Sequence, residues 1–337
     1  MTIDDSQLTG IMFPLIFCAI FPGNRNSTST TTTYLGFPLT ASHGIDSDAL
    51  AHRNALAAQR ASSIIFKFKE ARCTSVSLLR RLYLTYVRPC FFYGSQIAGY
   101  TQERLRLMQL VENRLQRAIL SCPPSTATDA MAYLLRIPHI NDQVDFLSDS
   151  WARRVAMLPP AHPTRASCET STAVKRGRGL KILSRGLDLA DKPKPKSPKD
   201  NPTYWSDLAS SSTSSALRAL IVLLPPASTH FKLILSLGGS AGHAIRLWLL
   251  HRLHPDPLLR SNPPFQEAPP FILQALRDLA EELGFTLPSV GVRVQGITLD
   301  PVSFMIYRIL HKAKPQRRSP LLLQLGTLLR EWRDLLS

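Results

Sequence analysis

The chain has 337 residues, and its hydrophobic fraction of 44% suits a folded protein with two modest domains. Forty Lys and Arg residues against 24 Asp and Glu residues give a formal net charge of +16, which favours polyanionic partners. The five cysteines are scattered and include no CxxC pair. This pattern argues against a disulfide framework and a zinc ribbon, and it indicates a reducing, intracellular compartment.

Residues 1–33 combine an apolar run with a low-complexity loop. The run at 11–21 (IMFPLIFCAIF) is too short to span a bilayer, and the acidic residues Asp4 and Asp5 before it make a poor signal peptide. We therefore interpret 11–21 as a buried strand and expect no membrane association. Residues 24–33 (NRNSTSTTTT) cannot pack a core and are predicted to form a loop.

Residues 34–158 are predicted to form one helical domain. A short extended run at 34–39 precedes a helix capped by Asp46 or Ser47. That helix carries an apolar stripe from Leu50 to Phe68. Beside the stripe a basic residue recurs every seven positions, at Arg53, Arg60 and Lys67.

A second helix in this domain has one apolar face and one arginine face. Its apolar residues recur at helical spacing at Val76, Leu79, Tyr83, Tyr86 and Val87. We expect Pro89 to break or kink the helix, because proline has no amide hydrogen and its ring crowds the carbonyl one turn back.

Later helices complete the predicted bundle. Thr101 is expected to cap a helix with Met108 facing inward and most of its arginines facing outward. A short helix ends near Leu135, and another begins at Asn141. The short connections favour a helical bundle.

Residues 159–215 differ in composition. They contain KRGRG at 175–179, a Lys-Pro run at 192–199 and a serine-rich run at 210–215. Charge repulsion and proline stiffness predict an extended, mobile basic linker.

Residues 216–337 are predicted to form a second, mostly helical module. Val290, Val292 and Val294 alternate with other residues, which indicates one short strand or hairpin, and Gly284 stands where a helix would stop. The expected fold class is therefore mainly α: a helical bundle and a second helical module joined by a flexible basic linker.

Several short motifs are shared, in order and spacing, with a known family. They are the segments 34–36 (YLG), 87–89 (VRP), 93–95 (YGS), 113–117 (NRLQR) and 136–140 (RIPHI). Over residues 34–165 the chain resembles the thumb region of reverse transcriptases of non-LTR retrotransposons. The resemblance implies that 34–158 is a thumb-like domain that grips template and primer, and that 1–33 is a remnant of the palm.

The catalytic carboxylates of that family are missing. Such polymerases hold two metal ions with carboxylates from a palm strand and from an aromatic-x-Asp-Asp turn. The nearest match, residues 1–5 (MTIDD), lacks the aromatic residue and any upstream carboxylate. We therefore expect a fragment that is not an enzyme and that holds neither a metal ion nor a cofactor.

Basic residues on helix faces and in the linker are the candidate contacts to RNA or DNA. Arginine and lysine neutralise phosphates, and tyrosine can stack on a base or sugar. The candidates are Arg80, Arg81, Arg88, Tyr93, Arg104, Arg114, Arg117, Lys175, Arg176 and Arg178. Surface arginines also simply solvate helices and cover apolar neighbours. The linker residues can be read as a nuclear address or as a flexible anchor to nucleic acid.

Two other function classes stay open. One is a helical protein-interaction module without nucleic-acid binding. The other is a serine hydrolase, because residues 238–242 (GGSAG) match the G-x-S-x-G elbow around Ser240, with Asp256 or Asp300 and His311 following in the order of a triad. His251 and His254 have a metal-ligand spacing, but no second ligand pair accompanies them, so no metal site is predicted. No oligomeric state is predicted.

Overall fold

The protein is described by a computed structural model. The described residues are 31–34, 37–40, 44–45, 47–71, 75–98, 100–170, 178–194, 196–212, 214–250, 265 and 268–335. The apolar run 11–21 lies outside these ranges, as do Lys175, Arg176, His251, His254 and Asp256.

A small antiparallel sheet precedes the helices. Its strands are β1 (Thr31–Tyr34), β2 (Phe37–Thr40) and β3 (Gly44–Ile45), in the order β1-β2-β3. Tyr34 pairs with Phe37, so the predicted extended run is confirmed. The predicted loop is wrong at its last three residues, because the β-branched side chains of residues 31–33 favour extended backbone.

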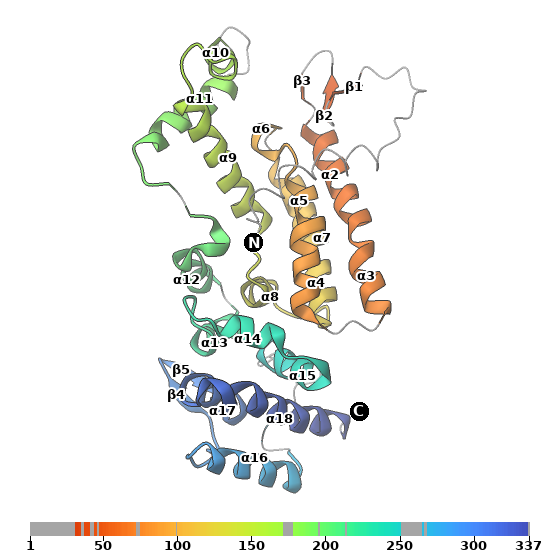
Figure 1. Cartoon of the computed structure of the whole chain (residues 1–337), viewed down its shortest axis with the longest axis vertical. Coiled ribbons are helices and arrows are strands. Elements are labelled where there is room, and N and C mark those ends of the chain that lie inside the picture. Colours follow the sequence, from red (N-terminus) through yellow and green to blue (C-terminus); the bar gives the residue numbers. More distant parts are fainter. Residues whose placement is uncertain are drawn as a thin grey trace, which may run out of the picture.

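The bundle is built from helices joined by short turns (Figure 1). Its elements are α2 (Ser47–Ala61), α3 (Ser63–Glu70), α4 (Val76–Leu82), the π-helix η1 (Tyr83–Val87), α5 (Arg88–Phe92), α6 (Ser95–Ala98), α7 (Gln102–Leu120), α8 (Thr128–Leu135) and α9 (Ile140–Met157). Thr101 caps α7 as predicted, since its side chain accepts a hydrogen bond from the Arg104 amide at 3.4 Å.

The predicted stripe from Leu50 to Phe68 is interrupted between α2 and α3. The hydroxyl of Ser62 donates to the carbonyl of Gln59, and such local bonding bends helices. Leu50 is fully buried, whereas Phe68 is 37% exposed. The prediction that both residues share one inward face is therefore wrong for Phe68.

Pro89 disturbs its helix as predicted, and the disturbance takes the form of a π-turn. The Arg88 amide donates to the carbonyl of Tyr83, five residues back, within η1. A π-turn holds an extra residue, so the residues after it are rotated relative to a continuous α-helix. Val87, predicted to face inward, and Phe91 are buried, whereas Tyr86, also predicted to face inward, is 44% exposed.

The segment predicted to be an extended linker contains helices. They are α10 (Pro163–Thr170), α11 (Arg178–Ala190), the 3-10 helix η2 (Pro198–Asp200) and α12 (Pro202–Ser211). Leu183 packs against Val155 and Ala156 of α9, and Trp205 is 1% exposed in the main core. The prediction is wrong for these described residues, because burial of apolar side chains outweighs local charge and proline content.

The C-terminal part is mainly helical, as predicted. It comprises α13 (Ser215–Leu223), α14 (His230–Ser236), α15 (Gly239–Leu250), α16 (Pro270–Glu282), α17 (Pro301–Lys312) and α18 (Pro315–Asp334), with the antiparallel strands β4 (Val292–Val294) and β5 (Ile297–Leu299). The predicted hairpin is thus confirmed. Gly284 follows α16 with a φ of +73°, a left-handed conformation that suits glycine at a helix end.

One hydrophobic core runs from Ala51 to Trp332 through both parts of the chain. The Tyr133 hydroxyl of α8 donates to the Leu224 carbonyl at 2.6 Å, and the Arg136 guanidinium lies 3.6 Å from the ring centre of Phe231. In Figure 1, α12 to α15 lie between the bundle and the helices α16 to α18. The mainly α fold class is confirmed, whereas the domain boundaries at 159–215 stay a prediction. No helix within the described ranges is long and apolar enough to cross a membrane.

Candidate nucleic-acid interface

The structure places the predicted contact residues in different environments. Arg81 and Arg114 are exposed, while Arg80, Tyr93, Arg104 and Arg117 are half-buried. Arg178 is the first residue of α11. Arg88 is buried, with only 6% of its surface exposed.

Arg88 belongs to a buried polar network. Its Nε donates to Oε1 of Glu112 at 2.9 Å, and its guanidinium also donates to the Pro138 carbonyl. The Tyr83 hydroxyl donates to the same Glu112 oxygen, and burial together with the Glu112 charge raises the pKa of Tyr83 well above its usual range. Glu112 is fully buried. The prediction that Arg88 contacts a phosphate is wrong, because its charge is matched inside the bundle.

The neighbouring motif residues also hold the bundle together. The side-chain amide of Asn54 in α2 donates to the Tyr93 carbonyl and to the Tyr100 hydroxyl, both at 2.7 Å. Gly94 adopts a left-handed φ of +72°, and the hydroxyl of buried Ser95 donates to the Phe92 carbonyl at 3.0 Å. The segment 93–95 is therefore a turn that ties α5 to α2.

Arg80 is partly committed to structure as well. Its Nε donates to the carbonyl of Leu135, the last residue of α8. Burial, and to a smaller extent the charge of Arg88, lowers the pKa of Arg80. A cation at the carboxyl end of a helix is favourable because the exposed carbonyls there carry partial negative charge. Arg80 thus fixes α8 against α4.

The exposed face of α7 carries the clearest surface cations. At 100° per residue, positions 103, 106, 107, 110, 114 and 117 fall within one arc of the helix. Arg106 and Arg114 are exposed on this arc, and Leu107 and Leu110 between them are 42% and 57% exposed. We call Arg106, Leu107, Leu110, Arg114 and Arg117 the α7 face.

The opposite side of α7 is buried and explains the orientation of that face. Its residues are Leu105, Met108, Glu112, Leu115, Gln116 and Ile119. Neither Arg106 nor Arg114 forms an ion pair with any described residue. Within the described residues, no ion pair therefore balances the charges of Arg106 and Arg114. Arg106 is not among the residues predicted from the sequence, although its spacing of four and eight residues from Leu110 and Arg114 indicates that the three share one helix face.

The serine elbow is not formed. The segment before Ser240, which the elbow requires to be a strand, is the helix α14. The Ser240 hydroxyl accepts a hydrogen bond from Arg330 at 2.8 Å, while His311 Nε2 lies 3.0 Å from the Leu223 carbonyl. Asp300 caps α17 through Ser303. The described members of the proposed triad therefore bind other partners.

No group of three or more His, Cys, Asp or Glu side chains arranged to hold a metal ion occurs within the described ranges. Comparison of the chain with protein-family models, with curated proteins and with solved structures found no match.

Proposed function

We propose that the protein is a non-catalytic nucleic-acid-binding fragment related to the thumb region of non-LTR reverse transcriptases. The single observation that carries the binding proposal is the α7 face, with exposed arginines beside exposed leucines and no ion pair to described residues. Exposed arginines donate hydrogen bonds to phosphate oxygens, and the aliphatic side chains offer apolar surface to sugars or bases.

The overall charge supports the same function. A net charge of +16 attracts RNA or DNA without regard to sequence, and binding of this kind weakens steeply with salt because each neutralised phosphate releases counterions. The protein is therefore expected to bind RNA/DNA hybrids, RNA and DNA with little sequence preference.

A salt-titrated binding experiment tests the α7 face. The double substitution Arg106→Gln and Arg114→Gln should weaken binding to a labelled RNA/DNA hybrid and lower the logarithmic salt slope by about 0.9 for each phosphate that the variant no longer neutralises. The matched control is Lys232→Gln with Arg277→Gln, which removes the same charge from exposed positions in α14 and α16. Equal weakening in both variants, or no binding at low salt, would contradict the proposal.

The absence of catalysis is tested separately. Purified protein supplied with a primed template, nucleoside triphosphates and Mg²⁺ should incorporate no nucleotide, because the chain lacks the carboxylate cluster of the family it resembles. Template-directed primer extension would contradict this part of the proposal.

A helical protein-interaction module is the second candidate, and the exposed Leu107 and Leu110 favour it. Such a module would bind its partner through apolar contacts with little salt dependence. Substitution of both leucines by glutamine would then abolish binding that the arginine substitutions leave intact.

We also propose an intracellular location with a nuclear address in the basic segment around residue 176. A fluorescent fusion should leave the nucleus when Lys175, Arg176 and Arg178 are replaced by glutamine. A fusion with Lys232, Arg277 and Arg293 replaced should stay there. Equal distributions would contradict the nuclear address.

A further inference from the structure

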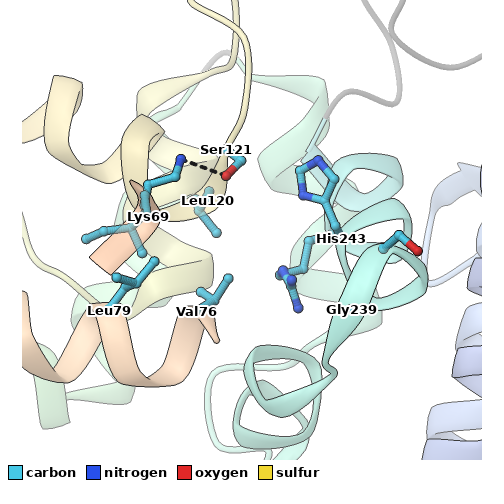
Figure 2. A pocket seen from close by; sticks show the side chains of 10 residues that line it. Lys69, Val76, Leu79, Leu120, Ser121, Gly239 and His243 are labelled. Carbon is cyan, nitrogen blue, oxygen red and sulfur yellow. Dashed lines mark hydrogen bonds between the residues drawn. The ribbon is translucent and has the colours of Figure 1, made fainter. Parts of the chain in front are cut away.

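A pocket of about 300 Å³ lies between the bundle and α15 (Figure 2). Lys69 of α3 and Ser121 after α7 line one side, and Gly239, Ser240 and His243 of α15 line the other. Val76, Leu79 and Leu120 add apolar walls. None of the described residues that line the pocket is acidic, and Lys69 and Arg246 give this part of its wall a positive charge.

Arg246 lines the same pocket and is 1% exposed. One terminal nitrogen of its guanidinium donates to the carbonyls of Leu237 at 2.7 Å and Ile234 at 3.2 Å, at the end of α14. Its buried Nε–H has no hydrogen-bond partner among the described residues. Burial lowers the pKa of Arg246 to about 10. A buried cation with an unmatched donor is costly unless an anion completes it.

The first turn of α15 adds a second source of positive potential. The helix begins at Gly239 and runs for 12 residues, so the amide groups of its first turn lack partners within the helix. Helix amino termini attract anions through these groups and through the helix dipole. The Ser240 hydroxyl at this end accepts a hydrogen bond from Arg330 and can donate its own hydrogen to a ligand.

Lys69 and His243 face each other across the pocket in Figure 2. Lys69 Nζ donates to Ser121 Oγ at 2.8 Å and to the Ala118 carbonyl at 2.6 Å, which leaves one of its three donors. Burial, followed by the charges of Arg246, Arg333 and Lys69, lowers the pKa of His243 to about 4. The cations Lys69 of α3, Arg246 of α15 and Arg333 of α18 therefore repel one another here. A bound anion would reduce that repulsion and stabilise the folded protein.

We propose that this pocket binds a phosphate group, held by Lys69, Ser240 and Arg246 at the amino end of α15. The phosphate is either free inorganic phosphate or the terminal phosphate of a nucleic-acid strand, since both present the same oxygens. The proposal is independent of the α7 face. It competes with one alternative, in which Arg246 serves only to bind the carbonyls at the end of α14.

Calorimetric titration with inorganic phosphate, at constant ionic strength set by chloride, tests the proposal. Wild-type protein should show one saturable site. Arg246→Met and Lys69→Gln should each weaken binding by roughly tenfold to a hundredfold, because each removes a charge-assisted hydrogen bond. The control Lys67→Gln removes an exposed charge two residues from Lys69 and should bind like wild type.

If Arg246→Met fails to fold, the variant Lys69→Gln still tests the proposal, because Lys69 is only half-buried. No saturable binding by wild-type protein, or equal binding by Lys69→Gln, would overturn the proposal. The imidazole signal of His243, assigned by its disappearance in His243→Gln, gives a local readout. Its pKa should rise as phosphate saturates the pocket, whereas an unchanged pKa would contradict binding there.

Matched oligonucleotides separate the two sources of phosphate. If the strand end is the ligand, a 5′-phosphorylated strand should bind about tenfold more tightly than the same strand with a 5′-hydroxyl, and Lys69→Gln should abolish the preference. If free phosphate is the ligand, both strands bind equally while phosphate itself still binds. The Arg106→Gln, Arg114→Gln variant should bind the strand more weakly but still bind inorganic phosphate. A loss of binding at the α7 face can then be told apart from a loss of binding at the pocket.

Discussion

Arg88 and Arg246 are both buried, yet they meet different surroundings. Arg88 has a carboxylate partner, Glu112, at 2.9 Å. Arg246 has carbonyl partners, and among the described residues its Nε–H has no partner and its pocket has no acidic side chain. The charge of Arg88 is therefore balanced within the folded chain, whereas we propose that an anion from outside balances the charge of Arg246. Burial of an arginine does not by itself say whether its role is structural, because the decisive observation is what balances its charge.

The largest expected effect concerns the Arg88–Glu112 ion pair. Arg88→Met should lower the free energy of unfolding by about 3–5 kcal/mol, since it leaves Glu112 buried without its cation. Adding Glu112→Leu to Arg88→Met should restore part of that stability, because the double variant buries no charge. Urea denaturation measures the free energy of unfolding of both variants. A double variant less stable than the single one would contradict an ion pair that is complete within the fold.

Two tightly packed glycines give intermediate effects and a matched comparison. A Cβ at Gly326 would lie 2.3 Å from the Ala241 carbonyl in the first turn of α15, and one at Gly186 would lie 2.2 Å from the Ala152 carbonyl in α9. Both Gly→Ala variants should lose about 1–3 kcal/mol in urea denaturation. Only Gly326→Ala should also weaken phosphate binding, because it displaces the pocket. Equal phosphate binding by the two variants would contradict a phosphate site at the start of α15.

Two histidines should give smaller effects of opposite sign with pH. Burial opposes charging of His139, but the contact with Asp129 at 3.4 Å outweighs burial and raises the pKa of His139. The contribution of this pair to the free energy of unfolding is therefore present below about pH 6.5 and lost as the pH rises through the folded-state pKa. The pair is partly exposed and should contribute less than about 1 kcal/mol.

His243 has the reverse sign, since its folded-state pKa is lowered to about 4. The unfolded chain takes up a proton first, so stability should fall as the pH drops from about 6.5 towards 4, by up to about 1 kcal/mol per pH unit. Urea denaturation across this range should show a flatter dependence in His243→Gln, and saturating phosphate should reduce the slope in wild-type protein. An identical profile in His243→Gln would contradict this account.

Local sequence rules predict much of the fold and little of the site. Helical periodicity predicts the bundle, and alternation predicts the β4–β5 hairpin, because both depend on neighbours in sequence. The π-turn that exposes Tyr86 and the burial of Trp205 depend on tertiary packing. The sequence places Arg88 on the surface because its partner Glu112 is 24 residues away and the pairing follows only from how α5 meets α7. The sequence around Arg246 does not show that the described residues of its pocket include no acidic side chain, because Lys69 and Ser121 come from distant segments of the chain.

The dependence of unfolding free energy on sulfate, a dianion whose charge does not change near neutral pH, tests the contrast between the two arginines most directly. Sulfate stabilises every folded variant to some extent by its exclusion from the protein surface. Beyond that shared effect, wild-type protein should gain about 2.7 kcal/mol when the anion reaches a hundred times its dissociation constant, and Arg88→Met should gain as much from its lower starting stability. Arg246→Met should gain only about 0.4 to 1.4 kcal/mol at the same sulfate concentration, because its site binds tenfold to a hundredfold more weakly. Equal gains in Arg246→Met and wild type, or no gain in wild type, would contradict the account.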